Sequence, residues 1–359
     1  MAHSTSPSER VLDLDGTRLK ITSYLRQFLE QKAQRALTDG LPTEVPNVLR
    51  DFVDAGGKRL RPLLCAAGWQ AAGGSGLPEP VVRTAAALEL YQAFALIHDD
   101  VIDRSATRRS RPAVHRALAD RHAKTGADAH VGMSAAILIG NMALTWSDEL
   151  VTGAGISAAR RVSVCEVLDA MREEMHYGQY LDLMASLGSL ADVDTSLTVI
   201  RYKTAKYTIE RPLHAGAALA GAGPALRRSL TRFALPLGEA FQLRDDLLGV
   251  MGDPKATGKP VLDDLREGKR TVLLALAVQR ADSTQRDVLE GLVGNQSLDE
   301  QGALRVVEVL RETQAASAVE QMINERYERS LAALEEAPVP AATADVLRAI
   351  ASLAVDRES

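Results

Sequence analysis

Two stretches of this sequence end an apolar run with paired carboxylates. The first, ALIHDDVIDR, places Asp99 and Asp103 four residues apart, so on a helix the two carboxylates stand one above the other. Asp100 lies about 100° around the axis and adds to the same negative pole. Because a helix C-terminus is already negative and burial penalises unpaired carboxylates, something cationic must compensate these acids. Magnesium binds one or two carboxylates together with substrate phosphates, so this spacing suits a magnesium site.

The second stretch, FQLRDDLLGVMGD, repeats the acidic pattern in a shorter form. Asp245 and Asp246 follow an apolar run, but the position one turn further on is Gly249 rather than a third acid. Gly238, Gln242, Asp245 and Gly249 share one face, which fits a cavity wall better than a packed core. Taken alone, each stretch could be a solvated acidic helix end. The occurrence of both favours metal and phosphate binding.

Basic side chains form several clusters near these acids. They lie in GGKRLRP (56–62), in the arginine pair after the first acids, in RYKTAKYT, and in TGKP and EGKRT after the second acids. Arginine binds phosphate oxygens bidentately, and lysine adds a compact charge. GGKR lacks the GxxxxGK[ST] spacing, so a nucleotide P-loop is not supported. Each cluster alone would be surface charge, but together with two acid pairs they indicate a cavity for two phosphorylated groups.

The elements that position these side chains are predicted to be helices. Alanine and leucine dominate, aromatic residues make up 4%, and no series of alternating β-branched strands is present. Glycine and proline breaks fall at 56–57, 71–80, 153–155, 221–224, 252–260 and 337–340. None of them reads as a domain linker. We therefore expect an all-α fold in one domain, residues 16–359, after a flexible tail of residues 1–15.

Composition narrows the classes of partner and compartment. The chain has 359 residues, and its net charge of -5 offers no general attraction to nucleic acid or anionic lipid. The N-terminus MAHSTSPSER lacks the apolar stretch of a secretory signal, and apolar windows such as MSAAILIGNMALTW are too short to span a membrane. Cys65 and Cys165 fit neither a zinc site nor a disulfide framework. We expect a cytoplasmic protein with no transmembrane segment and no nucleic-acid partner.

In their order along the chain, these motifs resemble those of the trans-isoprenyl diphosphate synthases, the head-to-tail prenyltransferases. The matching motifs run from Gly56 to Thr271 and are GGKRLRP, ELYQAFALIHDDVID, RRSRP, GQYLDL, KTAKYT, FQLRDDLLG, TGKP and DDLREGKRT. Any one motif is weak, but eight in this order are highly specific. The resemblance implies a single-domain isoprenoid synthase fold, with helices around a central cavity and two facing aspartate-rich helix ends. Such a chain is expected to be a homodimer.

The resemblance also implies roles for individual residues. The magnesium ligands would be Asp99, Asp100, Asp103, Asp245 and Asp246, with Asp264 in support. The allylic diphosphate would be held by Arg108, Lys203, Thr204, Gln242 and Lys259. Isopentenyl diphosphate, which binds without metal, would contact Lys58, Arg61, Gln92 and Arg109. Gln179 and Asp182 would line the cavity near the reacting carbons, with Lys269 near the closed site. Catalysis would rest mainly on Asp99, Asp103, Lys203, Asp245 and Lys259.

The implied reaction joins isopentenyl diphosphate to dimethylallyl, geranyl or farnesyl diphosphate. Magnesium and the basic residues neutralise the departing diphosphate, which leaves an allylic carbocation. The double bond of isopentenyl diphosphate attacks that carbon, and the released diphosphate takes the proton that restores an alkene. His98 is then a structural neighbour of the first acids and has no part in the proton transfer.

Product length should depend on what blocks the growing tail below the first acids. Phe94 lies five residues, or about 7.5 Å, before Asp99, and the small Ala95 lies four before it. A single aromatic at that depth resembles the short-chain synthases that make geranylgeranyl diphosphate. Phe94 and Ala95 are therefore predicted to set the chain length, with a farnesyl or longer product as alternatives. A simpler reading is that Phe94 only packs in the core.

Three positions depart from the family pattern, namely Ser110, Asn141 and Gly249. One carboxylate, substrate oxygens and water can hold an opposite-wall metal, so Gly249 need not abolish activity. Asp253 lies roughly 80° off the line of Asp245 and is a poor substitute for the missing acid. Two other functions stay open: a class I terpene cyclase, which needs no second-substrate pocket, and a weakly active partner subunit of another synthase.

Overall fold

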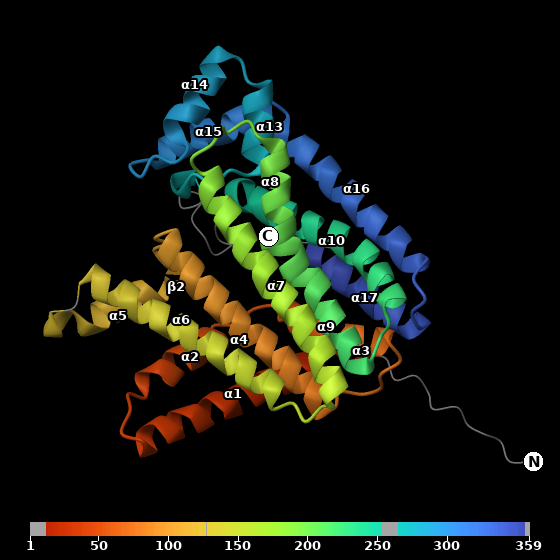
Figure 1. Ribbon diagram of the computed structural model, residues 1–359. Coiled ribbons are helices and arrows are strands. Elements are labelled where there is room, and N and C mark those ends of the chain that lie inside the picture. Colours follow the sequence, from red (N-terminus) through yellow and green to blue (C-terminus); the bar gives the residue numbers. More distant parts are fainter. Residues whose placement is uncertain (1–11, 127, 253–264, 356–359) are drawn as a thin grey trace, which may run out of the picture.

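The computed structural model describes residues 12–126, 128–252 and 265–355, which are almost entirely helical (Figure 1). The first half contains α1 (Leu14–Thr38), α2 (Glu44–Asp54), α3 (Leu60–Ala71), α4 (Glu79–Ile102), α5 (Val114–His122), the 3₁₀-helix η1 (Ala123–Thr125), α6 (Ala129–Thr152) and α7 (Ala158–Ala185). The second half contains α8 (Val193–Val199), the π-helix η2 (Ile200–Glu210), α9 (Arg211–Ala220), α10 (Pro224–Met251), α13 (Val272–Arg280), α14 (Ser283–Leu292), α15 (Glu300–Glu312), α16 (Ala315–Glu335) and α17 (Ala341–Val355). The all-α prediction is confirmed.

One short ribbon interrupts the helices. β1 (Thr107–Arg108) and β2 (Arg111–Pro112) pair antiparallel between α4 and α5. The two residues that join them, Arg109 and Ser110, both have positive φ, of 53° and 58°. This is the left-handed conformation that a two-residue hairpin turn needs. The ribbon places Arg108 beside the end of α4 and Arg109 beside the end of α2.

The helix boundaries follow the punctuation of the sequence. Each predicted break outside residues 253–264 coincides with a helix boundary of the structure, and the breaks at 71–80 and 221–224 overlap the ends of the adjoining helices. At the N-terminus the Asp13 side chain accepts a hydrogen bond from the Gly16 backbone N–H at 3.0 Å, so α1 begins at Leu14. Leu12 is buried as well. The predicted tail of residues 1–15 therefore extends too far, because its last residues belong to the helix start; residues 1–11 lie outside the described part.

Four helical segments, α4, α7, η2 and α10, form the central part of the molecule. α4 packs along α6 and α3, while η2 packs between α7 and α10, and α10 is covered on another side by α16 (Figure 1). A large cluster of buried apolar side chains, drawn from helices α1 to α17, fills the spaces between them. Since α4, α7, η2 and α10 each carry a polar motif identified in the sequence, this packing brings the motifs to one place.

Among the described helices, α6 is long and apolar enough to cross a membrane by length and composition. It also packs along α4 and α5, as a core helix of a globular protein does. Its outward face carries exposed apolar side chains, including Leu138, which is 67% exposed.

Candidate active site

The polar motifs line one cavity of about 920 Å³ between α4, α7, η2 and α10. α4 contributes Gln92, Ala95, Leu96 and Asp99, whose three- and four-residue spacing defines one face of that helix. The predicted binding residues that line this cavity are Lys58, Arg61, Gln92, Asp99, Arg108, Arg109, Gln179, Asp182, Lys203, Thr204, Gln242, Asp245, Asp246 and Lys269. Segments separated by up to about two hundred residues thus converge on a single space.

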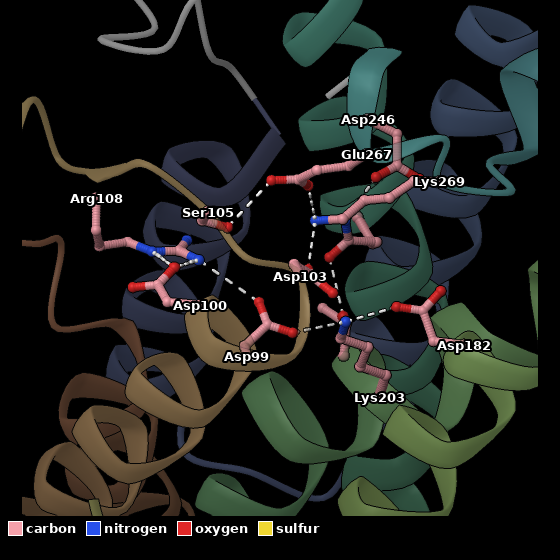
Figure 2. Close-up of polar contacts among 12 residues, drawn as sticks. Asp99, Asp100, Asp103, Ser105, Arg108, Asp182, Lys203, Asp246, Glu267 and Lys269 are labelled. Atoms are coloured by element: carbon pink, nitrogen blue, oxygen red, sulfur yellow. Dashed lines mark hydrogen bonds and ion pairs between the residues drawn. The ribbon is translucent and has the colours of Figure 1, made fainter. Parts of the chain in front are cut away.

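Two lysines that line the cavity, Lys203 and Lys269, lie among the acids (Figure 2). Lys203 Nζ lies 3.1 Å from Asp99 Oδ1 and 2.6 Å from Asp182 Oδ2. Lys269 Nζ lies 3.4 Å from Asp103 Oδ2 and 3.1 Å from Glu267 Oε2. The cationic compensation that the sequence requires for Asp99 and Asp103 therefore comes from two different walls.

The pKa values of Asp99 and Asp103 are shifted in opposite directions. Burial by itself raises the pKa of Asp99, but the charges of Lys203, Lys269 and Arg108 outweigh it and lower that pKa to about 2. Burial, together with the negative charge of Asp99, raises the pKa of Asp103 to about 6. The raised pKa of Asp103 therefore reflects two carboxylates held close together in a partly dry site, an arrangement that a divalent cation stabilises.

Asp100 occupies a different environment from the other two acids. Its side chain is buried and is not among the cavity-lining residues, and Arg108 Nε donates to its Oδ1 at 2.9 Å. Arg108 Nη2 reaches on to Asp99 Oδ2 at 3.5 Å. Asp100 therefore pairs with Arg108 about 100° around the helix axis from Asp99, and its role as a magnesium ligand stays a prediction.

A second polar region lies beside the acids and is built from three cations. Arg61 Nη2 donates to Thr208 Oγ1 at 2.6 Å, and its guanidinium lies 4.1 Å from the centre of the Tyr207 ring. Arg109, held by the left-handed turn, donates to the Gly56 carbonyl. Lys58 Nζ donates to the Leu353 carbonyl at 3.2 Å. The predicted isopentenyl diphosphate residues thus form a basic pocket next to the two acidic walls.

Gln92 belongs to the same pocket through Tyr207. The Tyr207 hydroxyl donates to Gln92 Oε1, which links α4 to η2 at the cavity wall. The neighbouring cation Arg59 turns away from the cavity and forms a buried ion pair with Glu89 at 2.6 Å. Within GGKRLRP, the flanking cations Lys58 and Arg61 face the cavity, and the one between them anchors the loop.

The second acidic motif lies on the α10 wall. Asp245, Asp246 and Gly249 all line the cavity, and the helix continues past them to Met251. A hydrogen-bond chain crosses from η2, because Thr204 Oγ1 donates to Gln242 Oε1 at 2.9 Å and Gln242 Nε2 donates to Asp246 Oδ1 at 2.7 Å. Gln242 and Thr204 therefore brace the α10 wall against η2.

The wide turn of η2 is held by a glycine on each side. A Cβ at Gly178 of α7 would lie 2.3 Å from the Lys203 nitrogen, and a Cβ at Gly238 of α10 would lie 2.5 Å from the Ala205 Cα. Both flanking helices can therefore touch the η2 backbone directly. π-Helical turns frequently mark functional sites, and this one carries Lys203 and Thr204. Gly238, predicted to face the cavity, faces η2 instead.

Gly178→Ala should destabilise the protein and reduce turnover together. The added methyl meets backbone, so we expect a loss of about 1–3 kcal/mol in the free energy of unfolding and a displaced Lys203. Gly291→Ala in α14 is the matched control, because its Cβ would meet nothing within 4 Å and alanine favours a helix. Urea unfolding and kcat check both variants. Equal behaviour of the two would contradict the close contact at Gly178.

Phe94 lies behind the cavity wall, although the prediction made it the floor. Its ring packs 4.6 Å from His98, 5.3 Å from Tyr91 and 5.7 Å from His176, measured between ring centres, and it is not a lining residue. Ala95 does line the cavity, as does Met175 of α7, which sequence reasoning missed. Phe94 points about 100° away from Ala95 around α4, into the packing with α7.

Several predicted residues lie outside the described part of the chain, and others were missed. Lys259, Asp264 and Asp253 fall within residues 253–264. Glu267 was quoted within DDLREGKRT without a role, and Tyr207 within KTAKYT. Their positions within these motifs were the signal that could have identified them. The contacts of Glu267 with Lys269 and of Tyr207 with Gln92 depend on the tertiary structure and could not be read from the sequence.

Comparison with known proteins agrees with this geometry. The family model described as Polyprenyl synthetase matches residues 42–310. A geranylfarnesyl diphosphate synthase from Aeropyrum pernix is 31% identical, covering 88% of this chain and 95% of its own. A geranylgeranyl diphosphate synthase from Saccharolobus solfataricus is 30% identical, and the match covers 84% of this chain and 87% of that protein. The chain therefore belongs to the polyprenyl synthetase family and is a trans-prenyltransferase.

The fold has a close match among solved structures. The crystal structure of geranylgeranyl pyrophosphate synthase from Corynebacterium glutamicum, complexed with isoprenyl diphosphate and magnesium, superposes with a TM-score of 0.90. Its sequence is 41% identical to this chain, with 97% of this chain and 100% of that chain covered. The isoprenoid synthase fold predicted from the motifs is thereby confirmed.

Proposed function

We propose that this enzyme condenses isopentenyl diphosphate with an allylic diphosphate in a magnesium-dependent reaction, and that its main product is geranylgeranyl diphosphate. The observation that carries the proposal is the single cavity that joins two acidic walls to a separate basic pocket. The acidic walls suit a metal-bound allylic diphosphate, and the pocket of Lys58, Arg61 and Arg109 suits a second diphosphate bound directly. A terpene cyclase would have no use for that pocket.

The acidic residues fit magnesium in the number and kind of their ligands. Asp103 Oδ2 is buried and accepts no hydrogen bond from any residue that the structure describes, and Lys269 Nζ lies 3.4 Å from it as an ion pair. A cation that replaced this lysine would find an oxygen ligand there. Within the same residues, no three acidic, histidine or cysteine side chains converge as a complete metal cage. Asp99 and Asp103 on one wall and Asp245 on the other would thus each supply part of a shell that diphosphate oxygens and water complete. Bound magnesium would neutralise charge on the leaving diphosphate.

The residues of the chain would then act on the leaving group and on the second substrate. Lys203 and Arg108, both largely buried, place positive charge where the allylic diphosphate departs. Although burial opposes it, Asp99 and Asp182 raise the pKa of Lys203, so this lysine stays charged at neutral pH. The basic pocket would hold isopentenyl diphosphate with its double bond toward the same cavity.

The test is product analysis with isopentenyl diphosphate, magnesium and each allylic primer in turn. We expect dimethylallyl, geranyl and farnesyl diphosphates all to be extended, and the twenty-carbon product to accumulate from each. A main product of fifteen carbons, or of twenty-five and more, would contradict the geranylgeranyl assignment and leave the prenyltransferase class intact. The relatives named above differ in just this respect, since one is called a geranylfarnesyl and the other a geranylgeranyl synthase.

Ala95→Phe should shorten the product. Ala95 lines the cavity one helical turn below Asp99, so a phenyl ring there occupies the path of the growing tail. We expect the main product to shift to fifteen carbons or fewer. Phe94→Ala, behind the wall, is the comparison variant and should change the length less. Chromatography of the dephosphorylated alcohols measures both, and a larger effect of Phe94→Ala would contradict this account of the wall.

We further propose that the enzyme is a homodimer formed through α6 and α7. Arg172 of α7 pairs with Asp148 of α6, so the outward faces of these helices adjoin. Those faces expose large apolar side chains, namely Ile137, Leu138, Met142, Tyr177, Tyr180, Leu183 and Met184. An apolar surface of this extent is typical of a protein–protein interface. A cytoplasmic location is proposed on the two free cysteines, Cys65 and Cys165.

Leu138→Glu should convert the dimer to a monomer. A buried, unpaired carboxylate at the centre of an apolar interface costs more than that interface can offset. Sedimentation should give twice 38.6 kDa for the parent protein and 38.6 kDa for the variant. Leu304→Glu on α15, where the leucine is 68% exposed, is the matched control and should stay dimeric. A parent protein of 38.6 kDa, or a dimeric Leu138→Glu, would contradict this interface.

A further inference from the structure

Lys203 and Lys269 each pair with two carboxylates that come from different parts of the chain. One partner belongs to the first aspartate motif, and the other is an acid from a different wall, Asp182 for Lys203 and Glu267 for Lys269 (Figure 2). In both cases the second acid is the closer, at 2.6 Å against 3.1 Å for Lys203 and 3.1 Å against 3.4 Å for Lys269. The same arrangement therefore occurs twice.

The second acids are both largely buried. Glu267 is mostly buried, and its Oε1 accepts a hydrogen bond from Ser105 Oγ at 3.1 Å, which ties it to the loop after α4. Asp182 projects from α7, one turn beyond Gln179, and its side chain is 20% exposed. A lysine that leaves its motif aspartate can therefore stay paired with its second acid, which keeps that lysine in the cavity wall.

A second acidic partner lowers the energy needed to separate each lysine from its motif aspartate. A lysine with one anionic partner must be separated from it before a cation can take that carboxylate, and in a partly buried site this separation is costly. A lysine with two anionic partners keeps one of them and remains within reach of a phosphate oxygen. The second acid therefore lowers the cost of metal binding by holding the competing lysine.

We propose that Glu267 and Asp182 are positioning residues that hold Lys269 and Lys203 ready for the diphosphate and so free Asp103 and Asp99 for a divalent cation. This rests on the proposed magnesium–diphosphate site. It assigns a role to two acids outside the aspartate motifs, and that role is exerted through the lysines. An ordinary extra metal ligand would act on the cation directly and would not depend on a lysine.

A double-mutant cycle on the full-length protein separates these two roles. Glu267→Gln removes the charge and keeps the size, Lys269→Met removes the competing cation, and the third variant carries both. The measurement is the dissociation constant for Mn²⁺ without diphosphate, from the electron paramagnetic resonance signal of the free ion. We expect Glu267→Gln to weaken Mn²⁺ binding about fivefold in the parent background and less than about twofold in the Lys269→Met background.

The outcomes decide between the alternatives. An equal weakening in both backgrounds would overturn the proposal, because the acid would then act on the cation without the lysine. Ser105→Ala keeps every charge and should leave Mn²⁺ affinity within about twofold. A change as large as that of Glu267→Gln would also overturn the proposal, because Glu267 would then act by holding the loop at Ser105 in place. If Glu267→Gln does not fold, the cycle of Asp182→Asn with Lys203→Met tests the same idea.

The proposal and the proposed magnesium site can fail separately. A parent protein that binds no Mn²⁺ even with inorganic diphosphate present would overturn the magnesium site, and the positioning role with it. If the parent protein binds Mn²⁺ but the effects of Glu267→Gln and Lys269→Met on that binding are additive, the positioning role is overturned and the magnesium site stands.

Discussion

Asp99→Ala should lower kcat about 10³-fold while leaving the fold intact. Asp99 lines the cavity and is held ionised, with a pKa of about 2, by the cations around it. Without this carboxylate the proposed magnesium loses a ligand on the α4 wall, and Lys203 loses one of its two acids. Transition-state charge stabilisation of this kind accounts for rate losses of about that size. Single-turnover kinetics with saturating substrates measures the effect.

The control for Asp99→Ala is an acid of the same type outside the cavity. Asp345 of α17 is an exposed helical aspartate that pairs with Arg348, and Asp345→Ala should leave kcat within about twofold. Circular dichroism and the unfolding midpoint establish that both variants fold. An Asp99→Ala enzyme with more than about a tenth of the parent activity would place the first metal elsewhere.

Asp245→Ala should lower kcat at least about 10²-fold, whereas Gly249→Asp should change it less than about threefold. Both residues line the cavity on the same wall, but Asp245 is the proposed metal ligand, and substrate oxygens and water would take the place of a carboxylate at Gly249. The pair of variants thus tests whether the shortened second motif is complete. Steady-state kcat and the magnesium dependence of the rate are measured for each.

Two results would contradict this reading of the second motif. A large gain of activity in Gly249→Asp would mean that the missing acid limits the natural enzyme. A weak effect of Asp245→Ala would mean that the α10 wall holds no metal. Asp253→Ala is predicted to matter less than Asp245→Ala, although Asp253 lies outside the described residues.

Much of the helical framework could be predicted from local signals in the sequence. Glycine and proline breaks such as Gly56-Gly57 and 221–224 separate the helices, because those residues end helices through backbone geometry that any tertiary structure must respect. The spacing of Asp99 from Gln92 and Ala95 likewise defined a face of α4 that lines the cavity. Both kinds of signal depend on neighbours within one or two helical turns.

What could not be predicted depends on contacts between distant segments. α4 is buried on nearly every side, so its sequence does not distinguish the face toward the cavity from the face that packs Phe94 against His176. The hairpin turn at Arg109 and Ser110 lacks the glycine or asparagine that would signal positive φ. The π-helical turn and the sharing of Lys269 with Glu267 arise only when α7, α10 and α13 are in place.

The most direct test of the central claim is incubation of the purified protein with farnesyl diphosphate and magnesium, with and without isopentenyl diphosphate. We expect geranylgeranyl diphosphate and inorganic diphosphate when both substrates are present, and no hydrocarbon when isopentenyl diphosphate is omitted. A cyclic hydrocarbon formed from farnesyl diphosphate alone would contradict the account, as would a protein that forms no prenyl product until a second chain is added.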